Sequence, residues 1–228
     1  MKRILFAVLP LFFLVSAFGD NITKKYDFKN FTGVSVGHGM HLKITQSDSY
    51  SVEVKADERD FKYLEVEKIG DNLEFHINKN NFRARDDIEV TISMPALTNL
   101  ELSGGSMGKF TMDVSSKSFE LELSGGSQVK GELKCSDINI ALSGGSQVSL
   151  EGKGKNVDLA GSGGSIFSLK NFSVKDVNAQ LSGGSQVRVA MNGTLNTVQS
   201  GGSELTYYGD IDLGHTSFSG GSEVRKGD

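Results

Sequence analysis

Residues 104–108 contain residue types that enzymes use, in a pattern that enzymes share. They read Gly-Gly-Ser-Met-Gly, which matches the G-x-S-x-G pattern around the nucleophilic serine of many hydrolases. That chemistry needs a strand-to-helix turn together with histidine and acidic partners. Here the pattern is one copy of a repeated tetrapeptide whose other copies lack the final glycine. We therefore expect no catalytic serine at Ser106.

Histidines and carboxylates occur along the chain without the spacing of a known site. His38 and His41 are three residues apart, and acidic residues cluster at 57–60 and 86–87. A metal centre needs a closed set of ligands, and glycoside hydrolysis needs two carboxylates at a defined separation. Calcium-binding β-rolls place an aspartate two positions after their repeated glycines, where this chain has serine followed by glutamine or glutamate. We predict no catalytic residue, no metal and no cofactor.

Cys135 is the only cysteine. A single cysteine excludes an intramolecular disulfide, and a small, partly buried thiol is the ordinary interpretation. The alternative is an intermolecular disulfide or a reactive thiol in an oxidising compartment.

The strongest pattern in the chain is a repeat of Ser-Gly-Gly-Ser. Successive copies begin 18 to 21 residues apart. A fixed period of about 20 residues is typical of stacked repeat architectures, which present long ladders of like side chains. The seven copies start at Ser103, Ser124, Ser143, Ser162, Ser182, Ser200 and Ser219.

Alternation of apolar and polar residues continues through each copy of the motif. Leu121, Leu123, Gly125, Ser127 and Val129 are all two positions apart. A two-residue hairpin would place the apolar face of one strand over the polar face of the next, because directly opposed residues share a face. A coil that bends at the glycines without reversing keeps the same side inward, so we predict in-register parallel strands.

This parity assigns roles to the residues of each motif. We expect the second serine to point inward and to form a hydroxyl ladder between neighbouring coils, and we expect a bulge in the irregular fifth repeat, residues 182–199. Glycines suit the corner because they reach positive φ without strain. The predicted corner residues are Gly125, Gly126, Gly144, Gly145, Gly183 and Gly184. The predicted outer ladder, a candidate binding face, is Ser124, Gln128, Ser143, Gln147, Ser182, Gln186, Ser200 and Glu204.

The fold class predicted from these patterns is all-β. We expect a parallel β-helix (β-solenoid) made of a single-stranded coil with about 19 residues per repeat. Residues 34–36, 40–44, 52–54, 73–77 and 88–94 alternate apolar and polar side chains, as half-buried strands do. We expect these N-terminal strands (residues 20–100) to stack on the solenoid of the repeats (residues 101–228), giving one domain over residues 20–228.

Residues 1–19 have the features of a secretory signal peptide. Lys2 and Arg3 precede a short apolar run, and residues 17–19 place small side chains at a cleavage site. We therefore expect export to the periplasm, the cell surface or the medium, with no transmembrane segment in the mature chain. The formal net charge of −4 argues against a nucleic-acid partner, since such proteins carry basic stripes.

Two parts of the chain resemble a known family. Residues 31–36, 40–46 and 50–54 are similar to its opening strands, and Leu-Ser-Gly-Gly-Ser repeats such as 123–127 and 142–146 follow. The family is the putative auto-transporter adhesin, head GIN domain family of bacterial exported proteins. The resemblance implies a β-helix-like fold and an exported or surface location, and it supplies no catalytic residue.

Three functions remain open from the sequence. The first is a non-enzymatic, exported β-solenoid that adheres or binds a glycan at the bacterial cell envelope, with a polysaccharide or a cell-surface partner. The second is a polysaccharide-acting β-helix enzyme, and the third is a purely structural envelope protein. The repeated hydroxyls and amides favour the first, because a regular polar face suits a repetitive ligand.

Overall fold

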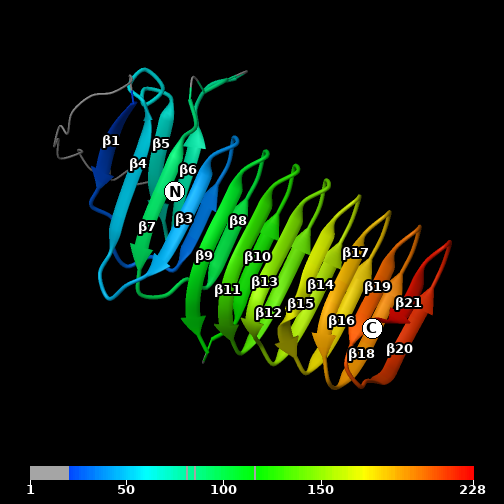
Figure 1. The fold of residues 1–228 in the computed structure, drawn as a ribbon. Coiled ribbons are helices and arrows are strands. Elements are labelled where there is room, and N and C mark those ends of the chain that lie inside the picture. The colour runs from blue at the N-terminus through cyan, green and yellow to red at the C-terminus, as the bar shows by residue number, and fades with distance from the viewer. Residues whose placement is uncertain (1–20, 81, 85, 116) are drawn as a thin grey trace, which may run out of the picture.

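The protein is described by a computed structural model that covers residues 21–80, 82–84, 86–115 and 117–228. The predicted signal peptide lies outside the described residues. Within them, strands and turns account for the fold, and no helix occurs. The strands lie side by side along one long axis, from the blue N-terminal end to the red C-terminal end (Figure 1).

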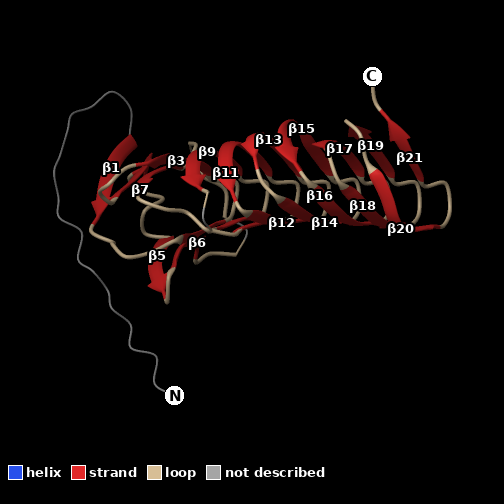
Figure 2. Cartoon of the chain, turned by 90° about the horizontal axis from the view of Figure 1, so that it is seen from below, coloured by secondary structure: helices blue, strands red, loops and turns tan. Residues whose placement is uncertain are grey.

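The strands form two sheets that face each other as two layers (Figure 2). Sheet A has 11 strands, in the spatial order β1 (Asn21–Tyr26), β4 (Ser51–Asp57), β7 (Glu89–Met94), β3 (His41–Gln46), β9 (Met107–Val114), β11 (Gln128–Cys135), β13 (Gln147–Lys153), β15 (Ile166–Val174), β17 (Gln186–Met191), β19 (Glu204–Tyr208) and β21 (Glu223–Lys226). Sheet B has 10 strands, in the order β20 (Asp212–Phe218), β18 (Thr194–Gln199), β16 (Asp176–Leu181), β14 (Asn156–Gly161), β12 (Asp137–Leu142), β10 (Phe119–Leu123), β8 (Asn99–Leu102), β2 (Gly33–Val36), β6 (Asn72–Ile77) and β5 (Leu64–Ile69).

Each repeat contributes one rung, which we define as a strand of sheet B, a Ser-Gly-Gly-Ser turn and the next strand of sheet A. Strand β10 leads through the turn at residues 124–127 into β11, and the chain then crosses back to sheet B and starts β12. Neighbouring rungs pair in parallel and in register, as in Leu121 opposite Ile140 and Val129 opposite Val148. The predicted β-solenoid is confirmed.

The path around the corner differs from the prediction. The Ser127 N–H donates to the Ser124 carbonyl at 3.3 Å, which closes a four-residue turn. The chain therefore reverses at the glycines, and the two strands that flank them lie in opposite sheets. Because these strands are not hydrogen-bonded to each other, the apolar face of one does not lie over the polar face of the other, as it would in a two-residue hairpin. The side chains that point into the core before the turn are therefore followed by side chains that point into the core after it.

The core lies between the sheets and follows the predicted alternation. Leu121, Leu123 and Val129 are buried, and so is the second serine of the first six motifs. The hydroxyl ladder between coils is wrong, however. Each of these serines donates to the carbonyl of the first serine of its own turn, for example from Ser127 Oγ to Ser124 O at 2.8 Å, so the hydroxyl closes the turn. Of the six, Ser203 also reaches the rung before, where its Oγ lies 3.5 Å from the Gly183 carbonyl oxygen.

The irregularity expected in the fifth repeat lies at its boundary with the fourth. The register between β15 and β17 shifts between Leu169 and Ser173, where β15 carries the extra residues. A smaller register shift occurs in the pairing of β13 with β15, between Ser149 and Glu151. Buried Phe172 lies in the inserted stretch, so the extra length adds a side chain to the core.

The N-terminal strands stack on the solenoid, as predicted, but not in chain order. Strand β2 lies between β6 and β8, and β3 lies between β7 and β9, so this early pair of strands is inserted between two pairs that come later in the chain. Strands β1, β4 and β5 are antiparallel to their neighbours and extend the two sheets at this end. Phe61 and Leu64 are buried there and close the core.

The C-terminal rung, β20 and β21, leaves its apolar residues open to solvent. Leu213 aligns with buried Leu195, and Phe218 aligns with buried Gln199. Leu213 and Phe218 are 63% and 48% exposed, since no further described strand covers them.

Candidate functional site

The predicted outer ladder is divided between two faces of the molecule. The first serines of the motifs, including Ser124 and Ser143, lie at the ends of the sheet B strands, whereas Gln128 and Gln147 begin the sheet A strands. Outward residues on either side of the turn point in opposite directions, because the two sheets face each other. The remaining predicted members divide in the same way, Ser182 and Ser200 with sheet B and Gln186 and Glu204 with sheet A.

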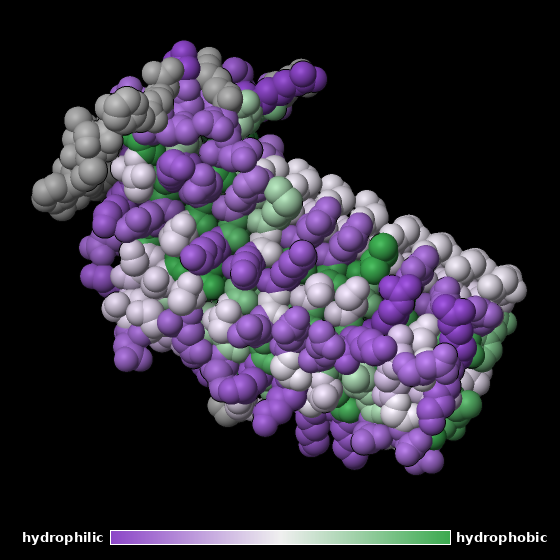
Figure 3. All heavy atoms as spheres, in the orientation of Figure 1, coloured by the Kyte–Doolittle hydropathy of each residue, from purple (hydrophilic) through white to green (hydrophobic). Residues whose placement is uncertain are grey.

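The predicted corner glycines form the turns and leave a smooth edge. Gly125 and Gly126 have φ values of 63° and 80°, which are unfavourable for residues with a Cβ. The added Cβ of Gly125 would lie 3.0 Å from the Gly104 nitrogen of the neighbouring turn. The stacked turns give the pale row along one long edge of the molecule in Figure 3.

The sequence analysis missed an eighth turn of this kind. Residues 37–40, Gly-His-Gly-Met, join β2 to β3, and His38 and Gly39 have φ values of 60° and 74°. Met40 is fully buried and takes the place of the inward serine, and its carbonyl accepts from the Met107 N–H. A four-residue gap with glycines between two alternating segments was the available signal.

The outer face of sheet B contains a trough of about 510 Å³ beside the serine row. Its floor is formed by Ala141 and Ala160, which are neighbours across β12 and β14. Glu122 and Gln180 continue the same line of residues on either side. The short alanine side chains between longer ones explain the hollow.

A second hollow of about 360 Å³ shares this floor. Its far side is a line of amides and carboxylates, with Asn139, Asp158 and Asn178 on consecutive strands. The Asn178 side chain donates to Asp158 at 2.7 Å, and Asn196 donates to Asn178 at 2.9 Å. These bonds hold the polar groups in fixed orientations along the solenoid axis.

The charged residues that line the trough and the second hollow are all acidic. Glu101, Glu120, Glu122 and Asp158 lie around the two hollows, and their lining residues include no lysine, arginine or histidine. The surface therefore offers hydrogen-bond acceptors, amide donors and hydroxyls over an apolar floor. Such a set suits a hydroxyl-rich, uncharged ligand better than an anion.

Groups considered for catalysis are held in inactive surroundings. Ser106 is buried and donates to the Ser103 carbonyl at 2.8 Å. Burial, with a smaller contribution from the Asp137 charge, raises the pKa of the Cys135 thiol to about 12, which disfavours the reactive thiolate.

Histidines and acidic residues pair without forming a metal centre. His76 lies 2.8 Å from Glu65 and His41 lies 3.6 Å from Asp87. No group of three or more potential ligands that could hold a metal ion occurs in the part of the chain that the structure describes. Across the same residues, no helix is long and apolar enough to cross a membrane.

Comparison with protein families matches residues 30–210 to the family described as "Putative auto-transporter adhesin, head GIN domain". The chain belongs to this family. The assignment supports an adhesin-like role rather than an enzymatic one. Comparison with curated proteins gives no match.

Solved structures of similar fold come from species of Bacteroides and Parabacteroides. A crystal structure described as a putative adhesin from Bacteroides fragilis has a TM-score of 0.82 and 19% identity, over 90% of this chain and 96% of that one. A putative adhesin from Parabacteroides merdae has a TM-score of 0.71 and 16% identity, over 92% and 97%. A structure from Parabacteroides distasonis described as a putative lipid binding protein has a TM-score of 0.73 and 15% identity, over 92% and 98%. At these identities the likeness shows the fold.

Proposed function

We propose that this protein is an exported, non-enzymatic adhesin-like solenoid of the bacterial cell envelope that binds a glycan in the trough of sheet B. The observation that carries the proposal is the trough itself. Over several successive rungs it combines an alanine floor with fixed amides and carboxylates on one side and the serine row on the other. Family membership supports adhesion as the setting.

The geometry favours a chain-like ligand over a small molecule. Amides or a carboxylate recur in line on four consecutive strands of sheet B, about 4.8 Å apart along the axis: Asn139, Asp158, Asn178 and Asn196. A linear polysaccharide can repeat the same contacts at several rungs, so weak individual hydrogen bonds add up. The hydrogen bonds between Asp158, Asn178 and Asn196 reduce the entropy that these side chains lose on binding.

The proposal is tested by a glycan array followed by calorimetry on a bound glycan. The double variant Ala141→Gln/Ala160→Gln fills the floor, and we expect affinity to fall about tenfold or more, equivalent to about 1.4 kcal/mol. Thr111→Gln, at an exposed site on β9 of sheet A, is the matched control and should change affinity less than about twofold. Unchanged thermal unfolding would show that the variants still fold.

Three outcomes would contradict the proposal. An array without any bound glycan removes the ligand class, and full affinity in the double variant removes the trough as its site. New reducing ends released from incubated polysaccharide would show an enzyme. The cellular location is tested separately, by cell fractionation with protease treatment of intact cells.

A further inference from the structure

The outer face of sheet A carries a row of lysines on adjacent strands. Lys43 on β3 lies opposite Lys109 on β9, which lies opposite Lys130 on β11. All three side chains are exposed. The row continues through Ser149 and Ser168 to Arg188. It spans six adjacent strands, or about 24 Å at the usual strand spacing.

These three lysines are unpaired, unlike others on the same sheet. Lys134 lies 3.2 Å from Asp113, Lys55 lies 3.0 Å from Glu89, and Lys25 lies 2.8 Å from Glu53. Among the described residues, no ion pair or side-chain hydrogen bond involves Lys43, Lys109 or Lys130. Like charges directly opposite each other in a sheet are destabilising, so stability does not explain the row.

The groups beside the row can bind uncharged parts of a ligand. Gln128 and Gln147 lie next to each other on β11 and β13, two residues before Lys130 and Ser149 on the same face. Amides and hydroxyls therefore accompany the ammonium groups along the solenoid axis. In Figure 3, which has the orientation of Figure 1, hydrophilic side chains cover much of the face over β9 and β11.

We propose that the row formed by Lys43, Lys109 and Lys130, with its flanking glutamines and serines, binds an acidic polysaccharide, a linear sugar polymer with closely spaced carboxylates. Ammonium groups spaced along an axis match a repeating anion better than a single small one. The adjoining hydroxyls and amides can both donate to and accept from sugar hydroxyls, which a polyphosphate does not have.

This site is independent of the trough and opposite to it in charge. The hollows of sheet B are lined by carboxylates and include no basic residue, so an acidic polymer would be repelled there. Two faces with different ligands would let one molecule join two polymers. Glu132 on β11 and its cross-strand neighbour Glu151 on β13 share the lysine face and limit its net charge, so we expect moderate and salt-sensitive binding.

The test measures binding of the purified protein to sodium polygalacturonate, with neutral dextran of similar length as the reference polymer. We expect binding to polygalacturonate alone, weakening as salt rises, and a loss of about tenfold or more in Lys43→Gln/Lys109→Gln/Lys130→Gln.

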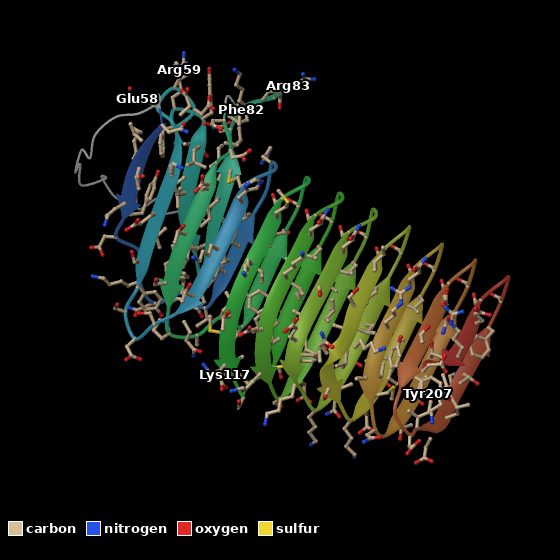
Figure 4. All side chains as sticks on the ribbon, viewed as in Figure 1. Glu58, Arg59, Phe82, Arg83, Lys117 and Tyr207 are labelled. Atoms are coloured by element: carbon tan, nitrogen blue, oxygen red, sulfur yellow. The ribbon has the colours of Figure 1, made fainter. Side chains whose placement is uncertain are left out.

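The matched control is Lys117→Gln/Lys155→Gln/Lys175→Gln, which removes the same charge from the corner opposite the glycines, where Lys117 is labelled in Figure 4. Its affinity should change less than about threefold.

Several results would overturn the proposal. Equal losses in the two triple variants would show a response to net charge alone. Binding to anionic phospholipid vesicles but not to polygalacturonate would make the row a membrane contact. Salt-sensitive oligomers that disappear in the first triple variant, without polymer binding, would make it an interface between copies. The Ala141→Gln/Ala160→Gln variant should keep its affinity for polygalacturonate, which separates failure of this site from failure of the trough.

Discussion

The first three Ser-Gly-Gly-Ser turns and the last three have the same four residues and different backbones. In the early turns, at Ser103, Ser124 and Ser143, both glycines have positive φ and the second serine's N–H donates to the first serine's carbonyl at 3.3 Å. In the late turns, at Ser182 and Ser200, only the first glycine has positive φ. The turn at Ser219 follows the late form.

Hydrogen bonds explain how the two forms are held. In the late turns the second glycine donates to the first glycine of the rung before, from Gly184 to Gly163 O and from Gly202 to Gly183 O, both at 2.7 Å. The early turns close on themselves, whereas the late turns extend the parallel ladder through the corner. The turn at Ser162 lies between them, with the late φ pattern and neither kind of bond among the described ones.

The comparison shows that one tetrapeptide forms the same corner with two backbone conformations. The change coincides with the register shifts around β15. Because the tetrapeptides are identical, the difference between the two forms must come from residues outside them.

The largest effect is expected for Gly183→Ala. The added Cβ would lie 2.6 Å from the Gly163 carbonyl oxygen, at a φ of 68° that disfavours any side chain. That carbonyl accepts from Gly184 and is not free to move. We expect a loss of about 2–4 kcal/mol in unfolding free energy, measured by denaturant titration. Gly125→Ala, which meets the Gly104 nitrogen at 3.0 Å, should cost less; the reverse order would contradict the ladder in the late turns.

Alanine substitution of the buried serines should separate the two forms next. The Ser182 carbonyl accepts the Ser185 hydroxyl at 2.8 Å and no other described bond, whereas the Ser124 carbonyl also accepts the Ser127 N–H. Ser185→Ala leaves the Ser182 carbonyl without its described partner and should cost about 1–3 kcal/mol, against about 0.5–1.5 kcal/mol for Ser127→Ala. Ser124→Ala, at a partly exposed site, is the control. Equal costs in chemical denaturation would mean that the turns do not differ.

A smaller contrast is expected at the second glycine. Gly126 has a φ of 80° with open space around its missing Cβ, so Gly126→Ala should cost about 1–2 kcal/mol through backbone strain alone. Gly184 lies outside the positive-φ region and its nearest neighbour would be 3.8 Å away, so Gly184→Ala should stay within about 0.5 kcal/mol of the parent. Equal melting temperatures for the two variants would refute the conclusion that Gly126 has a positive φ and Gly184 does not.

The alternation of inward and outward side chains, which we call parity, predicts part of this fold from the sequence but not all of it. Two-residue alternation through Leu123, Gly125 and Ser127 indicates which side chains point inward, and burial follows it. Parity does not indicate to which sheet an outward residue belongs. For that reason Ser124 and Gln128 were predicted to share one face, and the structure places them on opposite sheets.

The candidate sites depend on register, which the sequence shows only partly. Ala141 and Ala160 become a floor because β12 and β14 pair in register, a consequence of the regular 19-residue spacing. Lys43 reaches Lys109 only because β2 and β3 insert between two later rungs. No local pattern specifies that insertion, since it follows from long-range packing of the N-terminal strands.

Amide hydrogen exchange gives the most direct test of the two turn forms, because it changes no residue. The N–H groups of Gly184 and Gly202 are hydrogen-bonded to the preceding rung and should exchange only when that part of the ladder opens. The described hydrogen bonds include none from the N–H of Gly126, so this amide should exchange at nearly the rate of an unstructured chain. Nuclear magnetic resonance resolves the glycine signals individually, and similar protection at all three amides would show that the early and late corners share one conformation in solution.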